Sequence, residues 1–256
     1  MRTIVLGFIA LAGCASAGSP GAAGPAARPA LTNGEAVVRR MHEVHNRSWY
    51  RTLTFVQKTS FPDRPAQTWY EAAAFPGKLR IDIAPVDSAN ATMYVGDSIY
   101  AFRNGRRVAA RPERNLLLTL GFDVYGQPPE TTIRQLTEQD IDLSKMHQSS
   151  WQGRPVTIVG ASAGDSTSNQ FWVDTERMLF VRLIERVPRQ NNQTGRLDIE
   201  FNRYQRLGGG WIAPEVIIRM DGTEIMREEY SDMRADVELD PALFTTTGYT
   251  KPAWIR

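Results

Sequence analysis

Over most of this 256-residue chain, apolar and polar residues alternate with a period of two. The stretches 78–83 (KLRIDI) and 196–203 (RLDIEFNR) each place an apolar residue at every second position. Such alternation is typical of β-strands that bury one face and expose the other. Turn sequences such as Asn104-Gly105 and Asp221-Gly222 separate successive runs and predict hairpins.

Two segments depart from this period. Thr32 to Glu35 form a T-x-x-E capping sequence, which marks the start of a helix. The residues after it carry apolar side chains at helical spacing, which predicts a helix ending near Asn46. Residues 113–141 contain a leucine cluster, a Gly/Pro break and a second helical piece. They predict a helix–loop–helix insertion between two β-rich halves.

These elements predict an α+β fold that is mainly β. Consecutive strands joined by tight turns form an antiparallel meander. A sheet of about eleven strands must curl. We therefore expect a curved antiparallel sheet that forms an incomplete β-barrel, lidded by two or three helices. Its hollow either packs into a solid core or keeps a cavity.

The first residues predict a secretory signal. Arg2 precedes an apolar run that ends before Cys14 and is too short to span a bilayer. The sequence Leu11-Ala12-Gly13-Cys14 resembles the bacterial lipobox, which makes Cys14 the expected lipid attachment site. Ala15-Ser16-Ala17 offers an alternative cleavage after Ala17, which leaves a soluble periplasmic or secreted protein.

This interpretation divides the chain into three parts. We expect a signal peptide over 1–13, a lipidated cysteine and flexible tether over 14–30, and a single half-barrel domain over 31–256. The tether is rich in Gly, Ala, Pro and Ser and too poor in apolar bulk to fold. In a bacterium with two membranes, the expected location is the outer membrane, with the domain facing the periplasm.

Charge and cysteine content exclude several classes of protein. Without Arg2 the chain keeps 29 of its 30 basic residues against 28 acidic ones, a balance that argues against nucleic acid as a partner. A single cysteine excludes a disulfide framework and a cysteine-based metal site. We expect no cofactor and no metal.

No catalytic constellation is recognisable. Residues 160–164 (GASAG) match a nucleophile elbow around Ser162, but all three histidines precede this serine, so the order of a hydrolase triad is impossible. His42 and His45 flank Glu43 at a spacing one residue short of the zinc-protease motif, and we expect them to pack the helix. The prediction is that the protein is not an enzyme.

Four features together resemble the periplasmic lipoprotein-carrier and outer-membrane lipoprotein-sorting family (LolA/LolB-like). They are the capped N-terminal helix, the hairpin sequence GDSIYAF (96–102), the strand–turn–strand FWVDTERMLFVRLIE (171–185) and the ending VELDPALF (237–244). The resemblance covers nearly all of residues 31–247. It implies a strongly bent incomplete barrel, with helices covering an apolar pocket for acyl chains.

Period-two alternation and the leucine cluster supply candidates for this pocket. The expected cavity-lining residues are Trp69, Phe75, Leu79, Ile81, Ile83, Tyr100, Phe102, Leu116, Leu117, Leu120, Phe171, Val173, Leu183, Leu197, Ile199, Phe201, Ile218 and Met220, with Leu116, Leu117 and Leu120 in the lid. Each of them is also compatible with an ordinary core position.

Two functional hypotheses follow. In the first, a lipid-anchored envelope protein binds acyl chains or lipoproteins in its cavity for carriage or sorting in the periplasm. In the second, a sensor or scaffold lipoprotein of the same fold has a filled core and binds another envelope protein. Fold alone does not separate the two.

Overall fold

The computed structural model describes residues 30–189 and 193–255. From Leu31 onward the described residues form one compact unit. The predicted signal peptide, Cys14 and all but the last residue of the tether lie outside the described residues. Within the described chain, no helix is long and apolar enough to cross a membrane.

Within the described residues, thirteen strands form one open antiparallel sheet, two more than the roughly eleven expected for a curled meander. In spatial order they are β6 (Arg106–Pro112), β5 (Ser98–Arg103), β4 (Ala91–Val95), β3 (Lys78–Ile83), β2 (Gln67–Ala74), β1 (Thr52–Ser60), β15 (Thr223–Ala235), β14 (Glu215–Met220), β11 (Thr194–Asn202), β10 (Leu179–Pro188), β9 (Gln170–Asp174), β8 (Arg154–Val159) and β7 (Met146–Trp151). Strands β12 (Gln205–Leu207) and β13 (Gly210–Ile212) pair separately. The sheet does not close, so the predicted incomplete barrel is confirmed.

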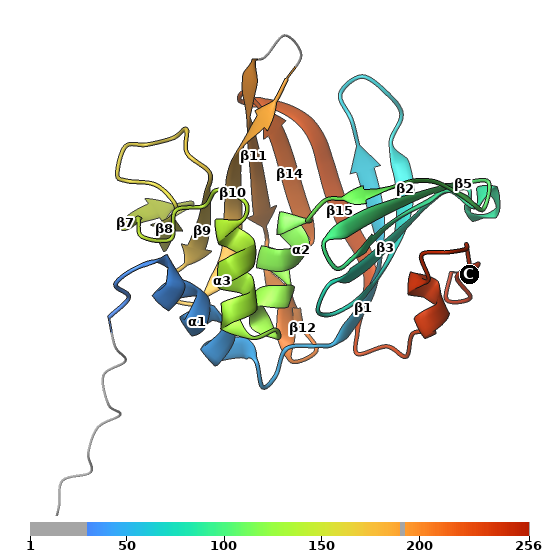
Figure 1. Cartoon of the computed structure of the whole chain (residues 1–256), viewed down its shortest axis with the longest axis horizontal. Coiled ribbons are helices and arrows are strands. Elements are labelled where there is room, and N and C mark those ends of the chain that lie inside the picture. The colour runs from blue at the N-terminus through green and yellow to red at the C-terminus, as the bar shows by residue number, and fades with distance from the viewer. Residues whose placement is uncertain (1–29, 190–192, 256) are drawn as a thin grey trace, which may run out of the picture. The chain divides into compact units, whose positions relative to one another are not determined.

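The two halves of the sheet meet where β1 pairs with β15. This register runs from Leu53 opposite Ala235 to Ser60 opposite Arg227, with a bulge between Thr54 and Val56. A bulge bends a strand and increases its twist. The first and last strands of the chain therefore lie side by side at the centre of the curved sheet (Figure 1).

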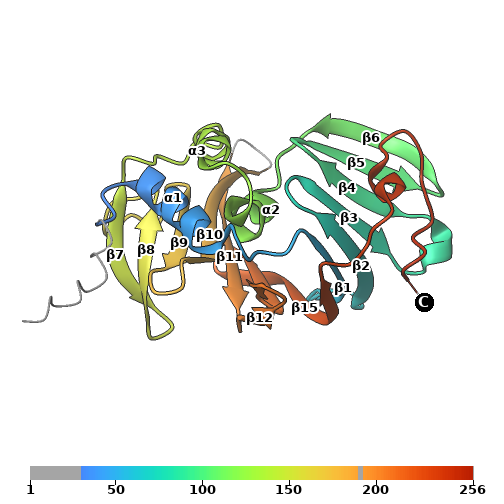
Figure 2. The same cartoon turned by 90° about the horizontal axis from the view of Figure 1, so that it is seen from below.

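In the part of the chain that the structure describes, three helices lie in the hollow of this sheet: α1 (Gly34–His45), α2 (Leu116–Gly121) and α3 (Pro129–Thr137) (Figures 1 and 2). Helix α1 begins one residue later than the capping pattern predicts, because the Asn33 side chain accepts the backbone N–H of Ala36 at 2.9 Å. Val37, Val38 and Met41 are fully buried. The predicted helix–loop–helix insertion is α2, a 3-10 turn η2 (Asp123–Tyr125) and α3.

The C-terminal half of the sheet packs tightly on these helices. Tyr125 in η2 is fully buried, and its hydroxyl accepts the backbone N–H of Phe180 at 2.9 Å. His45 is buried beside Trp49 and Tyr125, with its Nε2 atom 2.9 Å from the carbonyl oxygen of Arg177. This half of the hollow is a solid core.

The face of β2 and β3 that points away from the hollow is also covered. Arg80 and Asp82 form a buried ion pair there, and the Arg80 guanidinium donates a hydrogen bond to the carbonyl oxygen of Leu243 at 2.9 Å. The Tyr249 hydroxyl donates to Asp82 at 3.0 Å. The C-terminal segment, with its 3-10 turn η4 (Pro241–Phe244), thus seals this outer face.

Candidate functional site

An apolar cavity lies between α2 and the strands at the centre of the sheet. Its volume is about 80 Å³. The lining residues come from β1, β2, β3, β11, β15 and the segment around α2, and they are Leu53, Phe55, Gln57, Trp69, Glu71, Ala73, Phe75, Leu79, Ile81, Asn115, Leu117, Leu118, Phe122, Phe201, Glu228 and Tyr230. We call residues 114–125, which include α2 and η2, the lid.

Local hydrogen bonds fold the lid. Asn115 caps α2, because its side-chain oxygen accepts the backbone N–H groups of Leu117 and Leu118, each at 3.0 Å. Such a cap satisfies donors that a helix N-terminus otherwise leaves unpaired. The cap holds a helix of only six residues in place and turns Leu117 and Leu118 toward the cavity.

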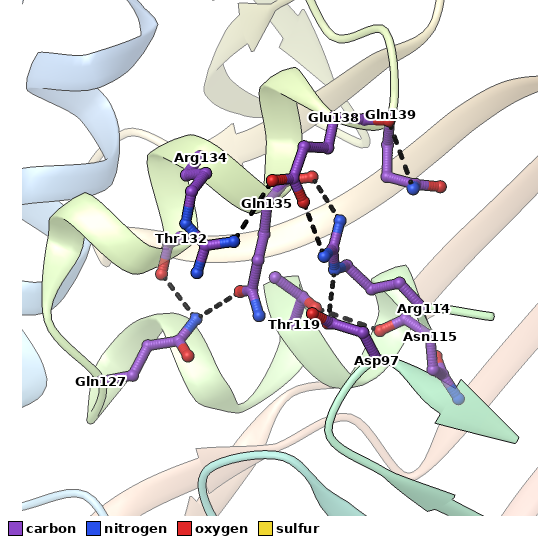
Figure 3. Close-up of polar contacts among 10 residues, drawn as sticks. All are labelled: Asp97, Arg114, Asn115, Thr119, Gln127, Thr132, Arg134, Gln135, Glu138 and Gln139. Atoms are coloured by element: carbon purple, nitrogen blue, oxygen red, sulfur yellow. Dashed lines mark hydrogen bonds and ion pairs between the residues drawn. The ribbon is translucent and has the colours of Figure 1, made fainter. Parts of the chain in front are cut away.

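Arg114 fastens the start of the lid to two other elements (Figure 3). Its guanidinium lies 2.8 Å from Asp97, in the turn between β4 and β5, and 2.8 Å from Glu138, which follows α3. It also donates to the carbonyl oxygen of Gln135 at 3.1 Å. The Arg114 side chain is only 8% exposed, so these bonds form in a partly desolvated setting where they are stronger than at an open surface.

A second attachment lies at the far end of the lid. The ring of Phe122 stacks in parallel on Phe75 at a centroid distance of 5.0 Å. The Asp123 carboxylate accepts the backbone N–H of Gly77 at 3.0 Å, and burial raises the pKa of this carboxyl to about 7. The lid is therefore tied to the β2–β3 hairpin by one aromatic contact and one hydrogen bond.

Two carboxyl groups are buried in the cavity wall. Glu71 on β2 is 5% exposed and Glu228 on β15 is 9% exposed. Burial, followed by the proximity of Glu228, raises the pKa of Glu71 well above its ordinary value. Burial also raises the pKa of Glu228 to about 7, against the opposing effect of hydrogen bonds from Tyr230 and Gln57.

The polar contacts of these two carboxyls differ. The Tyr230 hydroxyl donates to Glu228 at 2.7 Å. Within residues 30–189 and 193–255, no hydrogen bond reaches the Glu71 carboxyl. Glu71 therefore faces the cavity as a buried carboxyl without a hydrogen-bonding partner in the described chain.

Six of the residues predicted from the sequence meet in this cavity. They are Trp69, Phe75, Leu79, Ile81, Leu117 and Phe201. Leu116, Leu120, Phe171, Val173, Leu183, Ile199 and Ile218 are buried in the core instead, and Leu197 packs against that core. Ile83 and Met220 are half-buried and lie outside the cavity lining.

Tyr100 and Phe102 require a correction, because they lie on the opposite face of the sheet. Phe102 packs with Ala91 and Met93, and Tyr100 and Tyr249 pack against this group. The register pairs Leu79 with Tyr94 and Tyr94 with Ile99, so Ile99 rather than Tyr100 shares the face of Leu79. Alternation misassigned β5 because the C-terminal segment makes its outer face apolar as well.

The cavity residues that the sequence pattern missed fall into two groups, one apolar and one polar. Leu53, Phe55, Ala73, Leu118 and Phe122 are apolar residues on faces that alternation leaves undecided. Gln57, Glu71, Asn115, Glu228 and Tyr230 are polar or carry a polar tip, which usually marks a solvated face. Glu71 was the exception that the sequence could have revealed, because it lies at alternating positions with Trp69 and Phe75 and so falls on the same predicted face.

A larger hollow elsewhere is more strongly charged. Its volume is about 280 Å³, and its lining includes the charged residues Arg154, Asp174, Arg177 and Arg203. Arg154 is paired there with Asp174 at 2.6 Å. The cavity under the lid is the more apolar of the two and the better candidate for an apolar ligand.

The motifs that resemble catalytic sites occupy ordinary structural positions. Ser162 is exposed in the loop between β8 and β9. The His147 ring lies 3.0 Å from the carbonyl oxygen of Ala161. Among the described residues, no cluster of three or more His, Cys, Asp or Glu side chains is placed to hold a metal ion.

Comparison with known proteins identifies the fold. No protein-family model matches the sequence, and no curated protein matches it. Among solved structures, a DUF1329 family protein from Desulfovibrio piger ATCC 29098 is similar at TM-score 0.52 and 13% identity, over 83% of this chain and 95% of that chain. The LolA superfamily protein NE2245 from Nitrosomonas europaea is similar at TM-score 0.49 and 12% identity, over 84% and 98% of the two chains.

Both likenesses concern the fold alone. The first supports the open curved sheet described above, the incomplete barrel that the sequence predicts.

Proposed function

We propose that this protein is a non-enzymatic envelope protein that binds acyl chains of lipids or lipoproteins in the cavity under its lid, for carriage or sorting in the periplasm. The observation that carries the proposal is the cavity itself. Aromatic and aliphatic side chains form most of its wall, and a helix of six residues is its cover. An apolar chain gains about 25 cal/mol for each Å² that leaves water in such a site.

The volume of the cavity bears on how binding would occur. At about 80 Å³ it is well below the roughly 300–1,000 Å³ of typical ligand pockets. An acyl chain therefore enters only if the lid moves away from the sheet. Phe122, Asp123 and Arg114 attach the lid to the β2–β3 hairpin and its surroundings through one aromatic stack and a few polar contacts. Leu116, Leu120 and Tyr125 of the same segment are buried in the core, so opening must also separate part of that core packing.

The same small volume favours a second candidate function. A sensor or scaffold lipoprotein needs no internal space, and the C-terminal half of this hollow is already a solid core. Such a protein would bind another envelope protein on its surface. The two candidates differ in one measurable property, the ability to exchange an apolar ligand.

Ligand content tests the proposal. The full-length chain with Cys14→Ser, which removes the expected acylation, is purified without detergent, extracted with organic solvent and analysed by mass spectrometry. We expect a near-stoichiometric acyl-chain species. Leu117→Glu, which places a charge in the cavity wall, should abolish it, whereas Val108→Glu at a position 60% exposed should not. A folded protein without any lipid would favour the scaffold.

The proposal includes a lipid anchor at Cys14, which would attach the domain to the outer membrane through the tether. Metabolic labelling with radioactive palmitate tests this anchor directly. Labelled wild-type protein and unlabelled Cys14→Ser protein support it. Equal absence of label in both would leave a soluble periplasmic or secreted protein processed after Ala17.

A further inference from the structure

We propose that the cavity contains a binding site for the cationic, hydrogen-bond-donating head of an amine-bearing amphiphile, held at Glu71 in a wall that also includes Glu228. This inference rests on the proposed function, because it names the class of ligand that the same cavity accepts. It reaches beyond an acyl-chain site, which requires apolar walls and no charge.

The first observation is the unpartnered state of Glu71. Its side chain lines the cavity, Glu71 is only 5% exposed, and no hydrogen bond within the described residues reaches its carboxyl. Its oxygens are not among the fully buried atoms that lack a partner, so they keep a small accessible surface. A carboxyl so nearly enclosed needs water or a ligand in the cavity to satisfy it. A ligand donor placed at Glu71 supplies the missing partner.

The second observation is the sign of the charge around it. Glu228 lies near enough to Glu71 to raise its pKa, and none of the cavity-lining residues in the described chain is Lys, Arg or His. The other polar groups of the lining are Gln57, Tyr230 and Asn115, and Tyr94 on β4 lies close enough to Glu71 for its pKa to be affected. An ammonium group is the complement of this acidic, cation-free wall.

The third observation is the position of the carboxyls relative to the apolar wall. Glu71 shares its face of β2 with Trp69 and Ala73, and the register places it opposite Phe55 on β1. A ligand with its polar head at Glu71 thus has an alkyl chain directed along aromatic and aliphatic side chains toward the lid. An amphiphile satisfies both parts of the cavity, whereas a hydrocarbon leaves the carboxyls unpaired.

Binding of an ammonium group is coupled to the release of a proton from the buried carboxyls. Burial raises the pKa of the Glu228 carboxyl to about 7, so much of it is protonated at pH 6 and ionised at pH 8. When the ammonium enters at the lower pH, a protonated carboxyl loses its proton to the solvent, and the resulting carboxylate pairs with the positively charged nitrogen. The amine itself stays protonated, because its pKa of about 10 is far above the working pH. Affinity for an amine must therefore rise between pH 6 and pH 8.

Three probes of equal chain length test the inference: octylamine, octanol and octanoate. Isothermal titration of the full-length Cys14→Ser protein measures their affinities at pH 6 and pH 8. Titration in buffers of different ionisation enthalpy counts the protons released. We expect octylamine to bind most tightly, with proton release and tighter binding at the higher pH.

Variants locate the site. Glu71→Gln/Glu228→Gln should weaken octylamine about tenfold to a hundredfold, the range for charged hydrogen bonds, and should leave octanol within about twofold. Thermal unfolding checks that this double variant folds. Glu229→Gln is the matched control, because Glu229 adjoins Glu228 on β15 but pairs with exposed Lys58.

Each outcome has a definite meaning. Selective loss of octylamine binding in the double variant, together with proton release, supports the inference. Similar affinities for all three probes, or equal effects of the double variant on all of them, overturn the head-group site while leaving the apolar cavity intact. Failure of every probe to bind overturns both the inference and the proposed function.

Discussion

The guanidinium of Arg114 lies 2.8 Å from the carboxylate of Asp97, so the lid is tied to the turn between β4 and β5. The same guanidinium reaches Glu138 beyond α3. One side chain therefore links a hairpin, the lid and the helical layer at the edge of the cavity. The arrangement predicts that Arg114 governs how easily the lid leaves the sheet.

Replacing Arg114 by Met should loosen the lid more than it destabilises the whole protein. We expect a loss of about 1–2 kcal/mol in the free energy of local opening, since the acidic partners are half-exposed and screened by solvent. Hydrogen exchange of the backbone amides of residues 117–121 should accelerate about tenfold or more. Arg111→Met, which removes an exposed ion pair with Glu113, serves as the control and should not change that exchange.

The buried carboxyl of Glu228 predicts a pH dependence of stability. Its pKa is about 7 in the folded protein and near 4.5 in the unfolded chain. Between these values the folded state holds more protons than the unfolded state, so the free energy of unfolding falls as pH rises through this window. At about 1.4 kcal/mol for each pKa unit, the cost above pH 7 is on the order of 3 kcal/mol.

Glu228→Gln should remove that cost. Urea unfolding at pH 5 and pH 8 should show the variant close to wild type at pH 5 and more stable than wild type at pH 8. Glu229→Gln on the neighbouring exposed position should leave the pH profile unchanged. A Glu228→Gln protein that is less stable than wild type at pH 8 would contradict this account.

The buried pair of Arg80 and Asp82 predicts a large effect on the C-terminal segment. Two hydrogen bonds of 2.7 and 2.8 Å join the side chains, and both are 1% exposed. Asp82→Ala leaves Arg80 as an unpaired buried charge, which typically costs about 3–5 kcal/mol. The free energy of unfolding should fall by that amount, and limited proteolysis should release residues beyond 240 faster.

The exposed pair between Lys251 and Asp87 supplies the matched control for this experiment. Lys251→Ala removes a surface ion pair that solvent screens, so its contribution to stability is small. The variant should unfold close to wild type. If Asp82→Ala and Lys251→Ala had equal effects, burial of the first pair would not be the cause.

Local signals sufficed to predict much of this fold. Alternation identified the strands, turn residues such as Asn104-Gly105 marked the hairpins, and helical spacing located α1 and the insertion that forms α2 and α3. Sequence-distant contacts were not predictable in the same way. The pairing of β1 with β15 joins residues about as far apart as the domain allows, and no local pattern encodes it. Strand β7 was missed because its polar sequence, MHQSSW, lies at an edge of the sheet.

The cavity was less predictable than the fold for a physical reason. Where the C-terminal segment covers the outer face, both faces of β5 are apolar, and a period of two no longer tells Ile99 from Tyr100. The buried acids posed the reverse problem, because Glu71 and Glu228 have the residue type of a solvated face. Glu71 differs from a surface glutamate only in its position, because it falls on the same face of the alternating pattern as Trp69 and Phe75.

The stack of Phe122 on Phe75 predicts how fast a ligand leaves. The two rings are nearly parallel, with planes 2° apart, and this contact must separate when the lid moves. An aromatic pair contributes about 0.5–1.5 kcal/mol beyond its buried area. Phe122→Ala should therefore increase the dissociation rate of a fluorescent alkylamine about twofold to tenfold in stopped-flow displacement with unlabelled ligand. Phe61→Ala, which removes a ring contacted by Arg64 outside the cavity, should leave that rate unchanged. A dissociation rate that is the same in both variants would mean that the ligand does not pass the lid.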